Sequence, residues 1–65
     1  MRILRLKEVM YITGLGRSSI YQFINDGVFP RSINLGGGRA VGWLASEVDE
    51  WIAARVKERD QKVAA

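Results

Sequence analysis

Residues 6–27 of this 65-residue chain, LKEVMYITGLGRSSIYQFINDG, hold two short apolar repeats separated by Gly14-Leu15-Gly16. Because Gly14 can adopt the left-handed conformation that ends a helix, it predicts a break between them. The stretch therefore predicts helices over 6–13 and 17–25 joined by a tight turn, the layout of a helix-turn-helix. In each repeat apolar residues recur at i, i+3 and i+4, the spacing of one helix face: Leu6, Val9 and Met10, then Ile20, Phe23 and Ile24.

Residues 28–43, VFPRSINLGGGRAVGW, predict a β-hairpin. Pro30 cannot continue a helix and biases the residue before it towards an extended conformation. Residues 32–35 alternate polar and apolar side chains, and 40–43 form a plausible return strand. Between them, Gly36-Gly37-Gly38-Arg39 predicts a flexible, basic turn.

A last helix is predicted from about residue 46 onward. Ser46 and Asp49 have the spacing of a capping box. We expect residues 60–65 to fray at the terminus. The helix carries one apolar stripe formed by Val48, Trp51, Ile52 and Val56.

These elements predict a mainly α fold with a small β-hairpin, a winged helix-turn-helix that forms a single domain over residues 1–65. The chain has no cysteine and no histidine, which excludes disulfides and His-based catalysis and argues against a metal site or cofactor. We therefore expect no enzyme activity. No apolar run is long enough to span a membrane, so the expected location is the cytoplasm.

The positive charge lies in the first two thirds of the chain. Residues 1–43 carry six basic and two acidic residues, a net charge of +4, whereas residues 44–65 carry four basic and five acidic residues, a net charge of −1. This asymmetry favours a polyanionic partner for the first part, namely double-stranded DNA.

The polar face of the second helix is the first candidate binding surface. Short amide and hydroxyl side chains can hydrogen-bond base edges in a major groove, and the helix N-terminus favours a phosphate. The alternative is that an amphipathic helix simply exposes a polar face. The candidate residues are Arg17, Ser18, Ser19, Tyr21, Gln22 and Asn25.

The tip of the hairpin is the second candidate. Gly37 and Gly38 would let the backbone approach DNA closely, and Arg39 would contact either the phosphate backbone or the minor groove. The alternative is an ordinary hairpin turn with a solvated arginine. Arg2, Arg5, Lys7 and Arg31 could each contact a phosphate or form a plain solvated surface. Arg31, between the second helix and the hairpin, is the best candidate of the four. Trp43 and Trp51 are interpreted as core residues and not as platforms for base stacking.

Three segments give the chain a resemblance to a known family over residues 5–55: TGLGRSSIY at 13–21, GVFPR at 27–31 and LGGGRAVGWLASEVDEWI at 35–52. Together they resemble the AlpA family of small prophage transcriptional regulators. This resemblance implies a winged helix-turn-helix related to the MerR-type DNA-binding domain and to phage excisionases. It implies DNA binding and regulation of prophage genes, often with a link to an integrase.

The resemblance also assigns positions. It implies a recognition helix that carries Arg17, Ser18, Ser19, Tyr21 and Gln22, and a wing that carries Gly37, Gly38 and Arg39. Two positions depart from the usual family pattern. Gly16 replaces a serine, which weakens a helix cap, and Gln22 replaces an arginine, which implies a different DNA target.

Three functions remain open from the sequence. The leading one is a sequence-specific transcriptional regulator that binds DNA as a dimer or as a cooperative array on repeated sites. The second is an excisionase that bends attachment-site DNA for an integrase. The third is a protein-interaction adaptor that uses the C-terminal helix.

Overall fold

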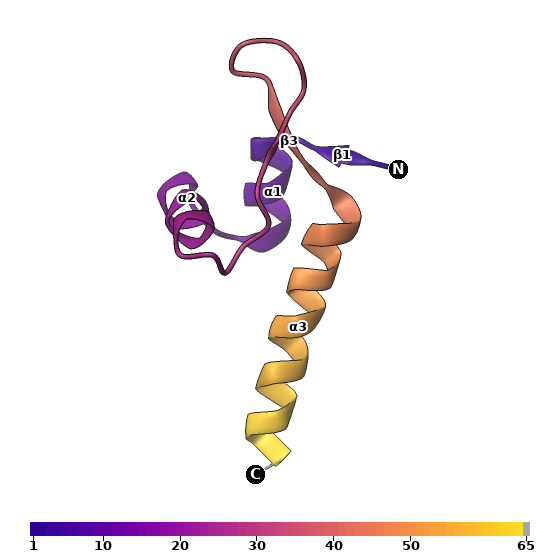
Figure 1. The fold of residues 1–65 in the computed structure, drawn as a ribbon. Helices are drawn as coiled ribbons and strands as arrows, with labels where there is room; N and C mark the ends of the chain where they lie inside the picture. The colour runs from indigo at the N-terminus through magenta and orange to yellow at the C-terminus, as the bar shows by residue number, and fades with distance from the viewer. Residues whose placement is uncertain (65) are drawn as a thin grey trace.

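The computed structural model describes residues 1–64, with side-chain detail for residues 1–61 (Figure 1). Three helices and a small three-stranded antiparallel sheet confirm the mainly α winged helix-turn-helix predicted above. The elements are β1 (Ile3–Leu4), α1 (Leu6–Thr13), α2 (Arg17–Asn25), β2 (Ile33–Asn34), β3 (Val41–Leu44) and α3 (Ala45–Ala64).

The turn between α1 and α2 has the predicted conformation. Gly14 has φ 74° and donates its backbone N–H to the Met10 carbonyl at 2.9 Å. The Thr13 hydroxyl donates to the Val9 carbonyl at 2.7 Å and accepts the Leu15 N–H at 3.2 Å. These bonds satisfy backbone groups at the end of α1 and fix the direction in which α2 begins.

Strand β1 was not expected from the sequence. It pairs with β3 in the register Ile3 with Leu44 and Leu4 with Trp43, while β2 pairs with the other edge of β3. Gly42 makes this approach possible, because a Cβ atom there would overlap the Ile3 side chain and lie 3.1 Å from the Leu4 carbonyl oxygen. The N-terminal residues are therefore part of the fold.

The core draws one fully or nearly fully buried side chain from almost every part of the chain. β2 alone among the described elements contributes none, since both of its residues are exposed. Because a chain this small buries little surface, the elements depend on one another to form this core. The core residues are Leu4, Val9, Ile20, Phe29, Trp43 and Val48.

The two tryptophans are core residues, as predicted. Trp43 is fully buried, and its indole N–H donates to the Pro30 carbonyl at 3.0 Å. Trp51 is half-buried, lies edge-on to the Phe29 ring with centroids 4.9 Å apart, and donates to the Val28 carbonyl at 2.6 Å. These two bonds connect the segment that follows α2 to β3 and to α3.

Helix α3 differs from the sequence prediction in two places: how the helix starts, and where its apolar stripe stops being buried. Strand β3 runs directly into the helix, so Ser46 is the second helical residue and the expected Ser46–Asp49 capping box is wrong. The Ala45 N–H instead donates to the Arg2 carbonyl at 2.9 Å. At the other end, Val56 is 43% exposed, because it lies beyond the last element that α3 packs against.

The second half of α3 extends away from the body (Figure 1). We call residues 53–61, all of them exposed, the free half of α3. The molecule is elongated as a result, with principal extents of 47 × 25 × 19 Å. The helix continues to Ala64 and residue 65 lies outside the described residues, so fraying of 60–65 stays a prediction. Within residues 1–64, no helix has the combination of length and apolar character needed to cross a membrane.

Candidate nucleic-acid interface

The first turn of α2 carries three of the predicted site residues. Gly16 is the residue before the helix, with an extended backbone and no side chain to cap it. Arg17, Ser18 and Ser19 follow, and all three side chains are exposed. The missing cap leaves the N–H groups of this turn without a side-chain partner from residue 16, so a ligand such as phosphate can approach them.

The rest of the helix presents two amides to solvent. Gln22 and Asn25 are both exposed, and Asn25 is the last residue of α2. The Gln22 amide donates to the Asp26 carboxylate at 3.4 Å, a long bond between exposed groups. Because such a bond contributes little, Gln22 can exchange it for a base edge at low cost.

Both residues of β2 are exposed. The tip of the hairpin, residues 35–40, is nevertheless an ordered turn held by hydrogen bonds. The Asn34 side-chain oxygen accepts the Gly36 N–H at 2.7 Å, and the Ala40 N–H donates to the Gly37 carbonyl at 2.7 Å. Gly38 has φ 52°, a conformation that L side chains rarely adopt. This turn fixes where the backbone leads into Arg39, whose side chain is exposed.

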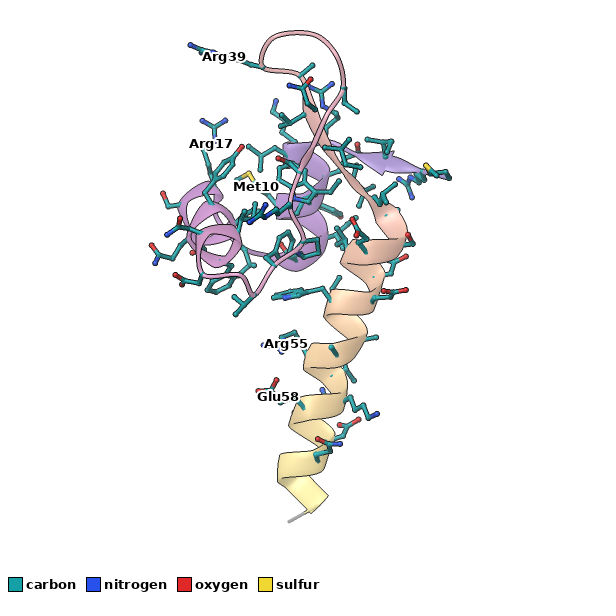
Figure 2. All side chains as sticks on the ribbon, viewed as in Figure 1. Met10, Arg17, Arg39, Arg55 and Glu58 are labelled. Atoms are coloured by element: carbon teal, nitrogen blue, oxygen red, sulfur yellow. The ribbon has the colours of Figure 1, made fainter. Side chains whose placement is uncertain are left out.

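A shallow hollow joins the two candidate surfaces. It has a volume of about 490 Å³ and lies where the start of α1, the start of α2 and the base of the wing meet. Figure 2 shows Arg17 and Arg39 extending to the same side of the molecule. The lining residues are Arg5, Leu6, Lys7, Arg17, Tyr21, Arg39 and Val41.

The hollow contains two cations that were not among the predicted site residues. Arg5 and Lys7, at the start of α1, are both exposed and line it beside Arg17 and Arg39. From the sequence, both were left open between a phosphate contact and a plain solvated surface. Their place near α2 depends on β1, which leads the chain across the sheet edge into α1.

Not every predicted residue belongs to this cluster. Tyr21 lines the hollow and is 44% exposed, so its hydroxyl is available to a ligand. Arg31 is exposed but is not among the lining residues. Gly37 and Gly38 lie at the wing tip and are also absent from the lining. The structure thus groups Arg17, Tyr21 and Arg39 and leaves the other candidates on surrounding surfaces.

The surface is suited to binding an anion. Among the described residues that line the hollow none is acidic, and no group of three or more acidic side chains in residues 1–61 could hold a metal ion. Glu8 accepts the Arg5 backbone N–H at 3.1 Å, but it lies outside the lining and pairs with Arg2. A lining of cations creates a positive potential that attracts polyanions. A helix with a short polar face beside such a potential is the arrangement by which proteins enter a DNA major groove.

Comparison with known proteins extends this picture. The model of the family described as "Prophage CP4-57 regulatory protein (AlpA)" matches residues 2–56, which include every element except the end of α3. The chain belongs to the AlpA family. Membership places the chain among DNA-binding transcriptional regulators of phage type.

Two relatives support the same assignment. The chain is 42% identical to the DNA-binding transcriptional activator AlpA of Escherichia coli strain K12, with 86% of this chain and 87% of that protein covered. It is 50% identical to the uncharacterized protein ORF88 of Enterobacteria phage P4, with 89% of this chain but 65% of that protein covered. The match to the family model ends at residue 56, within the free half of α3.

Proposed function

We propose that this AlpA-family chain is a sequence-specific DNA-binding transcriptional regulator, with α2 as the recognition helix in the major groove. The observation that carries the proposal is the exposed polar face of α2 directly beside a hollow lined by four cations. Ser18, Gln22 and Asn25 would contact base edges, with Ser19 at the border of that face. Arg17, Tyr21 and Arg31 would contact phosphates.

The wing is the second contact in this proposal. Gly37 and Gly38 bring the backbone close to DNA, and Arg39 contacts either a phosphate or the minor groove. The E. coli relative is named a transcriptional activator, which supports a role in transcription for this chain as well.

A domain with one recognition helix makes few DNA contacts. We therefore propose that the chain binds as a dimer or as an array of copies on repeated sites, because repeated half-sites multiply the contacts. If sedimentation and binding stoichiometry gave one copy bound tightly to one unrepeated site, this part of the proposal would be wrong.

Selection of binding sites from a random duplex library at near-physiological salt tests the function. The expected result is one short motif that recurs at fixed spacing. The Gln22→Ala and Asn25→Ala variants should recover motifs with relaxed preference at one position each, since each loses a base contact worth about 1–3 kcal/mol. The Gln61→Ala variant, which alters an exposed amide on the free half of α3, is the matched control and should recover the wild-type motif.

The same experiment separates the remaining functions. A motif found at attachment sites, with bending of the bound duplex, would assign the chain as an excisionase that acts with an integrase. Recovery of no motif would contradict sequence-specific regulation and favour a protein-interaction adaptor.

A further inference from the structure

The cations of this protein fall into two groups according to whether they have acidic partners. The ion pairs in the described residues join Arg2 to Glu8 at 3.4 Å, Arg55 to Glu58 at 2.9 Å and Arg59 to Asp60 at 2.8 Å. Within the part of the chain that the structure describes, none of these pairs includes a cation that lines the hollow.

The cations around the hollow come from separate parts of the chain. Arg5 and Lys7 come from the start of α1, Arg17 from the start of α2 and Arg39 from the wing. Like charges that are brought together by folding repel one another, and this costs stability. A bound anion would turn the same arrangement into an attraction, so the grouping suits a ligand better than it suits the free fold.

The rest of the lining narrows the kind of anion. Leu6 and Val41 are half-buried apolar residues in the wall, and Tyr21 adds an exposed ring and hydroxyl. A free inorganic anion has no apolar surface with which to contact Leu6 and Val41. A phosphodiester with its attached deoxyribose offers both a charge and an apolar sugar surface, and so matches both parts of the wall.

We propose that the hollow binds the phosphodiester backbone of one DNA strand, with Arg5 and Lys7 as additional phosphate contacts and Arg39 on phosphate instead of the minor groove. The proposal rests on the proposed DNA-binding function and specifies how the backbone is held beside the recognition helix.

The position of Arg39 decides between the two contacts open to the wing. Arg39 lines the same hollow as Arg17, a residue of the first turn of α2 (Figure 2). When α2 lies in the major groove, the strand at the edge of that groove passes this first turn. Arg39 faces that strand from the same hollow as Arg17, and this shared position favours a phosphate contact for Arg39.

Salt dependence of binding measures these phosphate contacts directly. The affinity of the full chain for a mixed-sequence duplex is measured by fluorescence anisotropy over a range of salt concentrations. Each phosphate contact adds about 0.9 to the slope of log affinity against log salt. The variants Arg5→Gln, Lys7→Gln and Arg39→Gln are therefore each expected to reduce the slope by about 0.9.

Lys57→Gln is the matched control. It removes one positive charge from the free half of α3, as each test variant does from the hollow, and it should leave the slope unchanged. All altered residues are exposed, so each variant should keep the wild-type circular dichroism spectrum and melt no lower than wild type.

A second pair of duplexes separates phosphate from minor groove. Arg39→Gln should weaken binding to an A-tract duplex and to a G·C-rich duplex by the same factor. A loss confined to the A-tract duplex would place Arg39 in the minor groove and overturn its assignment.

Two further outcomes separate a failure of this phosphate site from a failure of the proposed DNA-binding function. A wild-type slope that all three test variants retain would overturn the phosphate site while DNA binding stands. Absence of wild-type binding to any duplex at low salt would overturn the proposed function and this site together.

Discussion

The hollow and the free half of α3 both expose basic side chains, yet their surroundings differ. Around the hollow, four cations from three regions of the chain converge without an acidic residue in the described lining. Along the free half of α3, Arg55 lies 2.9 Å from Glu58 and Arg59 lies 2.8 Å from Asp60. Arg55 also lies over the Trp51 ring, 5.6 Å from its centre.

This difference teaches that the arrangement of charge, more than its amount, marks a binding surface. Exposed ion pairs contribute little to stability, but they neutralise the field that a polyanion would feel. The AlpA-family chain therefore has four cations gathered around the hollow, whereas residues 53–61 carry three basic and two acidic residues, a net charge of +1.

The largest expected effect is a loss of stability when the pairing of β1 with β3 is disturbed. Gly42→Ala should lower the free energy of unfolding by about 1–3 kcal/mol, because the added methyl group overlaps Ile3 and displaces β1. Chemical denaturation measures this loss.

Gly37→Ala is the control for that experiment. Its methyl group would lie 3.9 Å from the Ala40 Cβ, an ordinary contact, so stability should stay close to wild type. Equal stability of the two variants would show that β1 does not depend on Gly42.

A single added acid should act in opposite directions on stability and binding. Ser18→Glu places a carboxylate in the first turn of α2, where the helix dipole stabilises it by about 0.3–1 kcal/mol. The same charge beside the hollow should weaken DNA binding roughly fivefold, since it costs about 1 kcal/mol against a nearby phosphate. Thermal unfolding and anisotropy measure the two effects.

Ser46→Glu provides the comparison on the other region. Ser46 lies in the first turn of α3 and is exposed, so an acid there gains the same dipole stabilisation. It is not among the residues that line the hollow, so the change should leave affinity unchanged. If both glutamates weakened binding equally, the hollow would have no special role.

Removal of residues 58–65 should have a small effect. The deletion leaves the net charge at +3, since Glu58 and Asp60 are lost together with Arg59 and Lys62. It breaks the exposed Arg55–Glu58 pair, which contributes at most about 0.5 kcal/mol. Affinity for a single site, measured by anisotropy, should stay within twofold of wild type, and a larger loss would assign the free half of α3 a role in binding.

The smallest expected effect is a gain. Gly16→Ser supplies the missing cap of α2, at a position with an extended backbone and nothing within 4 Å of an added Cβ. The gain should be a few tenths of a kcal/mol, or about 1–3 °C in melting temperature. An unchanged or lower melting temperature would contradict the capping assignment.

Local sequence patterns predicted the elements whose signals are local. The apolar spacing at Ile20, Phe23 and Ile24 predicted α2, and Gly14 marked the end of α1. Strand β1 was missed because two residues are too short to show alternation, and only pairing with β3 makes Ile3 and Leu4 a strand.

The features that the sequence did not predict depend on contacts between segments that are distant in the chain. The apolar stripe of α3 continues to Val56, but a helix period does not reveal where the opposing surface ends. For Arg5 and Lys7 the sequence left a phosphate contact and a solvated surface open, because the hollow is assembled from α1, α2 and the wing, which are separated in the chain. A charge count detects such residues only as part of a total.

Backbone amide shifts of isotope-labelled protein during titration with a short duplex test the contrast between the two regions most directly. We predict that residues 5–7, 17–25 and 36–41 shift and that the exposed residues 53–61 do not. Shifts concentrated in residues 53–61, with residues 5–7 and 36–41 unchanged, would contradict the assignment of the hollow as the DNA-binding surface.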